Sequence, residues 1–211
     1  MIKGTPERIN GRREEIINAC ERLYQTMSFK DITLIEIGKA VPFSRPTIYN
    51  YFVTKEEIFL ALFQREYDRW NEQLSSILDR DEQLTCAQLA DRIARSLAER
   101  PQLLKLLSMN NYDMEANSRP EQLTAFKRSY GGSMQRMRSL LEKHRPEMGP
   151  ADIQNFIYTF FPFMFGIYPY TAVTEKQKAA MKDAGIDYVY QSVYELTYSC
   201  LIRLLSSGAG R

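Results

Sequence analysis

The segment TLIEIGKAVPFSRPTIYNYFVTK, residues 33–55, decides the fold of this chain. Thr33 and Glu36 have the spacing of a capping box, so an amphipathic helix is predicted to begin at Leu34. Pro42 ends that helix, because proline has no backbone N–H to donate and biases the residue before it away from helical geometry. A short helix that stops in a tight turn is therefore expected first.

A second short helix is predicted to follow the turn. Ser44 is a favourable N-cap, and Pro46 falls in the first turn, where a missing N–H costs little. Thr54 and Glu57 then have capping-box spacing and begin a long helix. Two short helices joined by a tight turn make a helix-turn-helix, which inserts its second helix into the major groove of DNA. The side chains on this second helix and its end are Arg45, Thr47, Tyr49, Asn50 and Tyr51.

The composition limits the classes of protein to which the chain can belong. With 211 residues, 44% of them hydrophobic, it can bury a real core and hold one domain or two small ones. Its 28 basic and 26 acidic residues leave a net charge of only +2, so any affinity for DNA must come from local placement. Up to Lys55, nine basic residues stand against six acidic ones, a local excess of +3.

No catalytic or metal-binding set is visible in the sequence. His144 is the only histidine, and no cluster of cysteine and histidine has metal-ligand spacing. The sequence also has no glycine-rich phosphate loop and no nucleophile–base arrangement. We therefore expect no metal, no cofactor and no enzymatic activity.

The cysteines and the apolar runs predict a cytoplasmic protein. Cys20, Cys86 and Cys200 are far apart and odd in number, which favours small core residues in a reducing compartment. No continuous apolar run follows residues 1–13, so they do not form a signal peptide. The most apolar stretch, residues 157–168, is too short to span a bilayer and contains proline and glycine.

Apolar residues recur at helical spacing along the rest of the chain, and no segment shows the alternation of a strand. The fold class is therefore predicted to be all-α. Ser118 and Glu121 are expected to cap one long helix, in which the pair Gly131-Gly132 marks a kink or a close contact. That helix is expected over about 119–143, and the other long or medium helices over about 6–27, 55–78, 86–100, 101–109, 150–168 and 188–206. An Asn-rich loop is expected at 110–118, and a short helix in the linker 171–187.

Three motifs lie in the N-terminal third of the chain. They are REEIINA at 13–19, FKDIT at 29–33, and SRPTIYNYF at 44–52 followed by KEEI at 55–58. Together they resemble the TetR (tetracycline-repressor-like) family of bacterial transcriptional regulators, over residues 8–65. The third motif is the most specific, because several residue types recur at fixed offsets. Ile35 departs from the pattern, since some members place a polar, base-contacting side chain there.

The resemblance implies a homodimer of all-helical subunits. Residues 8–54 would form a three-helix DNA-binding domain, and residues 55–211 a larger helical domain that binds a ligand and forms the dimer. The long helix that joins the two domains would transmit ligand binding to the recognition helices. The expected protein is a cytoplasmic repressor, associated with the nucleoid when bound to DNA. A small apolar or aromatic effector would release it from a palindromic operator.

The recognition helix supplies most of the expected DNA contacts. Arg45 can bridge the O6 and N7 atoms of guanine, while Thr47 and Tyr49 can meet a thymine methyl group. The other expected contacts are Pro46 and Asn50 and, at phosphates, Thr33, Tyr51, Lys55, Lys3, Arg8 and Arg12. The alternative is an ordinary solvated helix face, and because Tyr49 and Tyr51 cannot point the same way, one of them can be packing. The core of this domain is expected to hold Ile37, Ile48 and Phe52.

A set of aromatic side chains, together with methionines, suits a cavity for an apolar or aromatic effector. The expected lining residues are Phe63, Tyr67, Trp70, Met109, Tyr112, Phe126, Tyr130, Phe156, Phe160 and Phe163. A well-packed bundle core explains the same residues, so both interpretations stay open.

The last two long helices carry more apolar surface than one subunit comfortably buries. The residues concerned are Ile157, Phe161, Phe165, Tyr168, Val189, Val193, Leu196, Cys200, Leu201 and Leu204. Packed against a second copy, they would form a two-fold four-helix interface, a common solution in homo-oligomers. An intrachain core built from the same residues is the alternative.

Two other functions are compatible with the sequence. One is a helical carrier or sensor of apolar ligands without DNA binding. Salt-dependent DNA binding discriminates against it, because phosphate contacts release counterions. The other is a DNA-binding regulator controlled by a protein partner instead of a ligand, which a closed, dry C-terminal domain would favour.

Overall fold

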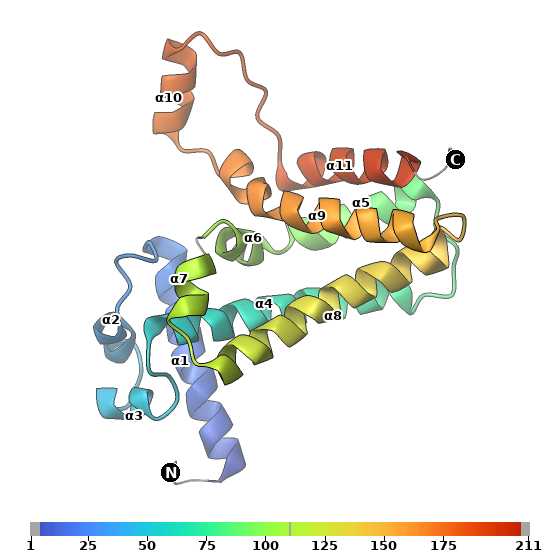
Figure 1. Ribbon diagram of the computed structural model, residues 1–211. Coiled ribbons are helices and arrows are strands. Elements are labelled where there is room, and N and C mark those ends of the chain that lie inside the picture. Colours follow the sequence, from blue (N-terminus) through green and yellow to red (C-terminus); the bar gives the residue numbers. More distant parts are fainter. Residues whose placement is uncertain (1–4, 110, 208–211) are drawn as a thin grey trace. The chain divides into compact units, whose positions relative to one another are not determined.

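The computed structural model describes residues 5–109 and 111–207, and over these residues it contains helices and no strand (Figure 1). The described helices are α1 (Pro6–Thr26), α2 (Leu34–Lys39), α3 (Arg45–Tyr49), α4 (Lys55–Leu78), α5 (Cys86–Ala98), α6 (Pro101–Leu107), α7 (Asn111–Ala116), α8 (Pro120–His144), α9 (Pro150–Thr171), α10 (Glu175–Asp183) and α11 (Val193–Ser207). The prediction of an all-α fold is confirmed.

The chain divides into two compact units. The N-terminal unit consists of Met1–Arg65 and Asn110–Ser129, and the C-terminal unit of Glu66–Met109 and Tyr130–Arg211. Both α4 and α8 therefore have one end in each unit. The unit that holds the helix-turn-helix is larger than the expected residues 8–54, because it includes α7 and the first part of α8. Lys3 and the last four residues of the expected second domain lie outside the described residues.

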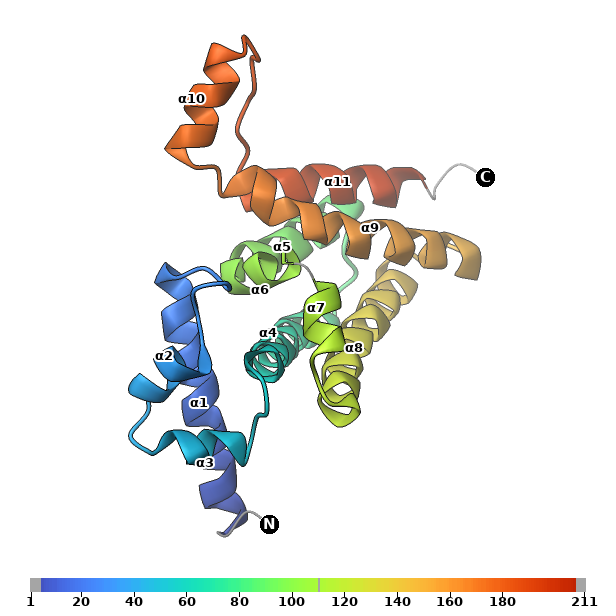
Figure 2. The same cartoon turned by 60° about the vertical axis from the view of Figure 1, so that its left-hand side comes forward.

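Side-chain caps begin the first two helices. Thr5 begins α1 and Thr33, as predicted, begins α2, each accepting a hydrogen bond from the backbone N–H three residues on, at 3.4 and 3.2 Å. Ser44 is the N-cap residue of α3, but its hydroxyl lies 3.1 Å from Thr47 Oγ1 instead of bonding a backbone N–H. Figure 2 shows α1, α2 and α3 grouped together in the N-terminal unit.

Buried apolar side chains and one arginine hold this unit together. Ile37, Ile48 and Phe52 are fully buried, as predicted. Arg65 of α4 reaches α1, where its guanidinium donates to Asn18 Oδ1 at 2.6 Å and to Glu21 Oε2 at 2.8 Å. These two hydrogen bonds tie α1 to the first part of α4.

In the C-terminal unit, α5 and α9 both pack against α11, and α6 packs against α9 (Figure 1). Trp70 of α4 is fully buried, and its indole N–H donates to Ser96 Oγ at 3.0 Å. Beside it, Ser133 Oγ of α8 donates to Asn71 Oδ1 at 2.7 Å. A Cβ at Gly132 would lie 3.3 Å from Asn71 Nδ2. The predicted weak point in α8 is therefore a close contact with α4.

Two predicted boundaries around the middle of the chain are wrong. The expected loop at 110–118 contains α7, which places Met114 in a buried position. Ser118 does not cap α8, because its hydroxyl donates to the Met114 carbonyl at 2.6 Å. The helix begins instead at Pro120, whose fixed φ suits the first helical position.

The last helix begins at Val193 and not at Tyr188 as predicted. Ser192 and Glu195 set this start through a reciprocal cap. The Ser192 N–H donates to Glu195 Oε2 at 2.8 Å, and the Glu195 N–H donates to Ser192 Oγ at 3.2 Å. Residues 188–192 consequently stay outside the helix, although their apolar side chains resemble a helical face.

Residues 172–192, named here the α10 arm, connect α9 to α11. Figures 1 and 2 show α10 projecting beyond α9 and α11 within the C-terminal unit. Thr174 and Gln177 form a capping box at its start. Gly185, with φ 69°, ends it, and the Ile186 N–H donates to the Met181 carbonyl at 3.0 Å. Among the described residues no single helix is long and apolar enough to cross a membrane; α9 and α10 reach that length and composition only as a pair bent by 85°.

The only histidine is buried in the C-terminal unit. His144 Nδ1 accepts a hydrogen bond from the Leu84 N–H at 3.2 Å. Burial, together with the positive charges of Lys143 and Arg92, lowers the pKa of His144 below its ordinary value of 6.5, while Glu82 opposes the shift. The ring is therefore a neutral structural acceptor near neutral pH.

Candidate nucleic-acid interface and effector site

The exposed face of α3 carries a paired arginine and tyrosine. Arg45 Nη2 donates to the Tyr49 hydroxyl at 3.3 Å, and the guanidinium lies 5.8 Å from the centre of the Tyr49 ring. The two residues are one helical turn apart, so they share a face. Tyr49 is 45% exposed, and Arg45 is exposed as well. The pair therefore presents a donor-rich, planar group together with an aromatic edge.

The other predicted residues on this helix are placed around the pair. Pro46 and Asn50 are exposed, and Thr47 is half-buried. Because Ile48 is fully buried on the opposite side, the helix cannot turn its reading face inward without exposing core. The structure thus brings Arg45, Pro46, Thr47, Tyr49 and Asn50 to one short, anchored helix.

Tyr51 and Lys55 are placed differently from the expectation that they contact phosphate. Tyr51 is only 8% exposed, which makes it the tyrosine that packs inward. Lys55 Nζ donates to the carbonyls of Phe29 and Ile32 at 2.8 and 3.0 Å, and it lies 4.2 Å from the centre of the Phe29 ring. This ammonium group ties α4 to the segment before α2.

The flanking charges and apolar groups complete the surface. Thr33 remains exposed while it caps α2, and Arg8 is exposed near the start of α1. Arg12 lies over the Phe43 ring at 5.9 Å and is half-buried. Sequence reasoning gave no DNA role to Val53, which is exposed at the end of the turn after α3. Its apolar type offered no such signal.

An ion pair between a buried carboxylate and a partly exposed arginine contacts the turn that follows α3. Glu57 is fully buried, and Arg119 donates to both of its oxygens, from Nε to Oε1 at 2.6 Å and from Nη2 to Oε2 at 2.9 Å. Arg119 Nη2 also donates to the Tyr51 carbonyl at 3.0 Å. The neighbouring Thr54 hydroxyl donates to the Asn117 carbonyl at 2.9 Å. The segment just before α8 is thus fastened to the turn that follows α3.

The same carboxylate modifies the predicted cap of α4. Thr54 accepts a hydrogen bond from the Glu57 N–H at 3.2 Å, as predicted, but the Glu57 side chain bonds the Val53 N–H at 2.8 Å. Burial alone would raise the pKa of Glu57. The hydrogen bonds from Arg119 and from the Val53 N–H outweigh that effect, so its pKa lies below the ordinary value. Glu57 is therefore an ionised residue of the unit's interior.

The predicted effector residues do not all fall in one unit. Phe63, Tyr112 and Phe126 belong to the N-terminal unit, where the Phe63 and Phe126 rings pack at 4.9 Å. Tyr112 is 84% exposed. The members in the C-terminal unit are Tyr67, Trp70, Met109, Tyr130, Phe156, Phe160 and Phe163.

The aromatic members in the C-terminal unit form a continuous cluster around Phe161. The Phe161 ring lies 6.0 Å from Trp70, 5.7 Å from Tyr130 and 6.3 Å from Phe160. Tyr130 in turn contacts Tyr67 at 5.6 Å, and burial raises the pKa of the Tyr67 hydroxyl well above its ordinary value. The sequence allowed Phe161 either a dimer interface or an intrachain core, and its burial in this cluster fits the intrachain core.

The predicted dimer residues also divide in two. Ile157, Phe161 and Leu201 are buried within the protomer, which fits the intrachain alternative. Phe165 is 39% exposed and Val189 is largely exposed. Tyr158, which the sequence analysis did not single out, is 65% exposed on α9, off the apolar stripe that faces the core.

Two family models match the chain. The model described as the tetracyclin repressor-like C-terminal domain covers residues 64–209, and the model of bacterial regulatory proteins of the tetR family covers residues 16–62. The chain belongs to the TetR family. It is a DNA-binding transcriptional regulator, and regulators of this family act without enzymatic activity. The described part of the TetR-family chain contains no group of three or more histidine, cysteine, aspartate or glutamate residues that could hold a metal ion.

Known proteins resemble this chain in sequence over part of its length and in overall fold. The HTH-type transcriptional regulator EthR of Mycolicibacterium smegmatis is 37% identical over 51 residues, which are 24% of this TetR-family chain and 24% of EthR. The FadR repressor of Thermus thermophilus, solved with lauroyl-CoA, is 21% identical, with a TM-score of 0.60 over 93% of this chain and 94% of FadR. FadR of Bacillus subtilis, solved with stearoyl-CoA, is 16% identical, with a TM-score of 0.59 over 92% and 97%. At identities of 21% and 16%, these two comparisons show that this chain has the same fold as the two FadR proteins.

Proposed function

We propose that this regulator is a repressor that binds a palindromic operator as a homodimer and is released by an apolar or aromatic effector. The observation that carries the DNA-binding part is the exposed Arg45–Tyr49 pair on an anchored recognition helix. Arginine is the commonest reader of guanine in the major groove, and the tyrosine ring beside it suits a thymine methyl group. Thr47 and Asn50 complete the reading face.

Long acyl-CoA molecules are the first effectors to test. Two proteins of the same fold were solved with lauroyl-CoA and stearoyl-CoA. In this chain the aromatic cluster around Phe161 is the apolar region that we propose opens to take the acyl chain, and the hydrogen-bonded Ser133 and Asn71 lie on the same two helices as Tyr130 and Trp70. A mostly apolar site with a few polar groups is the usual composition of a small-molecule pocket.

The dimer in this proposal forms through α9 and α11. These two helices lie side by side in the C-terminal unit (Figures 1 and 2). Tyr158 and Phe165 leave aromatic surface exposed on α9. Covering such surface with a second copy gives a closed two-fold interface. The core residues Ile157, Phe161 and Leu201 support these helices from behind.

Effector release then requires two linked equilibria. The effector binds more tightly to a conformation in which the two recognition helices are badly spaced for successive major grooves, so its binding lowers operator affinity. Helices α4 and α8 are continuous between the units, which makes them the elements that carry the change. Arg119 joins the start of α8 to the turn after α3.

The test begins with selection of a preferred duplex from a randomised pool, followed by fluorescence anisotropy with that duplex. We expect a palindromic preference, strong salt dependence, and large losses of affinity for Arg45→Ala and Tyr49→Ala. Arg128→Ala serves as the control, because Arg128 is exposed on α8 outside the helix-turn-helix. Lauroyl-CoA should then lower the affinity of the wild-type protein. Absence of salt-dependent DNA binding would favour a ligand carrier instead.

A further inference from the structure

The α10 arm exposes apolar side chains although its backbone is well defined. None of the residues of α10 is buried. The exposed apolar residues at and beyond its ends are Tyr170, Ile186, Tyr188, Val189 and Tyr190, with Val189 at 81%. Contiguous exposed apolar surface on a folded protein usually marks an interaction site.

The α10 arm has a defined structure in the single protomer. Its capping box and its terminal glycine fix both ends of α10. The Tyr188 and Tyr190 rings pack edge to face at 5.1 Å, and Lys178 lies over the Tyr190 ring at 5.8 Å. A partner therefore meets a formed surface, and little ordering entropy opposes binding.

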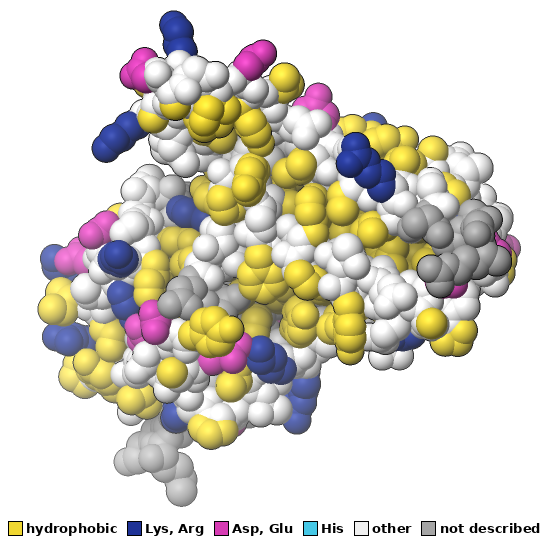
Figure 3. Space-filling model, turned by 45° about the horizontal axis from the view of Figure 1, so that its top comes forward, with side chains coloured by type: hydrophobic (Ala, Val, Ile, Leu, Met, Phe, Trp, Pro, Cys, Tyr) yellow, Lys and Arg dark blue, Asp and Glu magenta, His cyan; other side chains and the backbone are white. Residues whose placement is uncertain are grey.

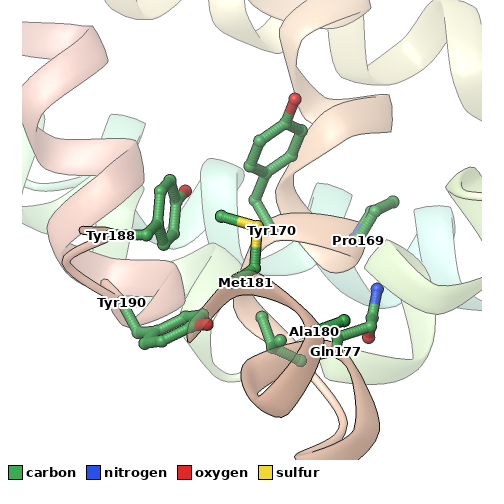
Figure 4. Close-up of a pocket in the computed structure, with 8 residues that line it drawn as sticks. Pro169, Tyr170, Gln177, Ala180, Met181, Tyr188 and Tyr190 are labelled. Carbon is green, nitrogen blue, oxygen red and sulfur yellow. The ribbon is translucent and has the colours of Figure 1, made fainter. Parts of the chain in front are cut away.

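A hollow of about 450 Å³ lies between the arm and the end of α9 (Figure 4). Figure 4 shows Met181, Tyr188 and Tyr190 on the arm side and Pro169 and Tyr170 on the α9 side. In the space-filling view, hydrophobic side chains cover much of the arm and continue onto the neighbouring helices of the same unit (Figure 3). The hollow is large enough to accept one or two aromatic side chains.

The charge of the arm argues against nucleic acid or an anionic membrane surface as its partner. Its charged residues are the lysines Lys176, Lys178 and Lys182 and the acids Glu175, Asp183 and Asp187. Three positive charges balance three negative ones, so the arm offers no net attraction to phosphate. An apolar face with balanced charges at its edge is typical of contacts between protein subunits.

The hollow is continuous with the exposed stripe of α9. Tyr158, Pro162, Phe165 and Pro169 follow one another at spacings of four, three and four residues, which places them on one exposed helical face. Pro169 also lines the hollow. The spacings of the stripe, though not its residue types, are symmetric about the midpoint between Pro162 and Phe165. Two α9 helices paired antiparallel, with the two-fold axis at that midpoint, would set Tyr158 of one copy opposite Pro169 of the other.

We propose that the hollow receives a second copy of this chain, with the ring of Tyr158 of the partner subunit entering between Pro169 and the arm tyrosines. Each subunit would then hold Tyr158 of the partner subunit in its own hollow, so the contact, named here the clasp, would occur twice in the dimer. This inference rests on the proposed dimer and adds the arm to its interface. The site is incomplete in one protomer, because the ring that fills it comes from the other.

The first experiment measures dimer dissociation by sedimentation velocity over a dilution series. The variants are Tyr188→Ser/Tyr190→Ser and Tyr158→Ser, and Lys176→Ser/Lys182→Ser is the matched control on the polar side of the arm. We expect both tyrosine variants to raise the dimer Kd by roughly tenfold or more, since aromatic residues dominate such contacts. The lysine control should stay within about twofold of wild type. Combining the tyrosine changes should add little to either alone, because they remove the same contact.

Chemical crosslinking tests the pairing directly. With Cys86 and Cys200 replaced by serine, Tyr158→Cys together with Met181→Cys should give a covalent dimer with a short bismaleimide reagent. Tyr158→Cys together with Lys176→Cys should give little. Circular dichroism spectra and melting curves that match wild type establish that the variants are folded.

The outcomes separate this inference from the proposed function. A wild-type dimer whose Kd is unchanged in the tyrosine variants overturns the clasp and leaves the repressor proposal intact. A monomeric wild-type protein overturns both the clasp and the proposed dimer. A clasped dimer that binds no DNA retains the clasp while the proposed function fails.

Discussion

Arg119 donates two parallel hydrogen bonds, of 2.6 and 2.9 Å, to the carboxylate of Glu57, which lies 62 residues earlier in the sequence. Bidentate pairs between arginine and a carboxylate are the strongest of the charged contacts in proteins. Here the carboxylate is fully buried and the arginine is partly exposed. Without the guanidinium, Glu57 keeps the hydrogen bonds from the backbone N–H groups of Val53 and residue 119 but loses its positively charged partner.

Replacing Arg119 by alanine should destabilise the protein by about 3 kcal/mol, because it leaves a buried charge uncompensated. Urea unfolding followed by circular dichroism measures this loss. Glu121→Ala is the matched control, since the Arg119–Glu121 contact of 3.6 Å is exposed and should contribute less than about 1 kcal/mol. A loss as small as the control's in Arg119→Ala would show that the buried carboxylate is satisfied by other groups.

His144 should make the protein less stable in mild acid. Its pKa in the folded protein is lowered below 6.5, so the unfolded chain binds more protons at this position. Stability is therefore fully present above the unfolded pKa and falls as the pH drops from about 6.5 toward the folded pKa. Urea midpoints between about pH 7.5 and pH 5 should show this slope, and His144→Gln should flatten it. An equal slope in the variant would assign the acid sensitivity to the carboxylates.

The Arg45–Tyr49 pair predicts a graded series of DNA-binding defects. Arg45→Ala should weaken binding to the selected duplex by roughly 5- to 150-fold, the range of one good base contact. Tyr49→Phe should lose less than Tyr49→Ala, because the ring remains while the hydroxyl that accepts from Arg45 is removed. Anisotropy against the selected and a scrambled duplex separates lost specificity from lost affinity. Equal losses on both duplexes would reassign Arg45 to phosphate contact.

Trp70, the only tryptophan, should report effector binding. It is fully buried beside Phe161, and its indole N–H is bonded to Ser96 Oγ. Binding of lauroyl-CoA within the aromatic cluster should change its emission intensity or wavelength in a saturable way. Coenzyme A without the acyl chain is the control ligand and should have no comparable effect. A response to both ligands alike would place the site away from the cluster.

Much of the fold could be predicted because its signals are local. Thr33, Thr85 and Thr174 each cap a helix through the residue three positions on, so four consecutive residues carry the whole interaction. Proline and helical periodicity supplied most of the remaining boundaries. The start of α11 was predicted wrongly because the apolar residues from Tyr188 onward resemble a helical face. The reciprocal cap between Ser192 and Glu195 starts the helix later, at Val193.

The site was less predictable because its contacts are distant in sequence. Arg45, Tyr49 and Ile48 could be assigned from one helix, and their exposure and burial follow its periodicity. Nothing near Lys55 indicates that its ammonium group binds two carbonyls before α2. The position of Phe161 could not be predicted either, because apolar residues recur at the same helical spacing whether they face the core of the protomer or a second subunit.

The boundary between the two units has a consequence for how this protein can be divided into fragments. It cuts through α4 and α8, so no cut at a single point in the chain separates one unit from the other. A fragment of the N-terminal unit that ends at residue 65 would lack Arg119. The buried Glu57 carboxylate would then have lost its positively charged partner. A fragment that keeps the N-terminal unit whole therefore needs Asn110–Ser129 as well as Met1–Arg65.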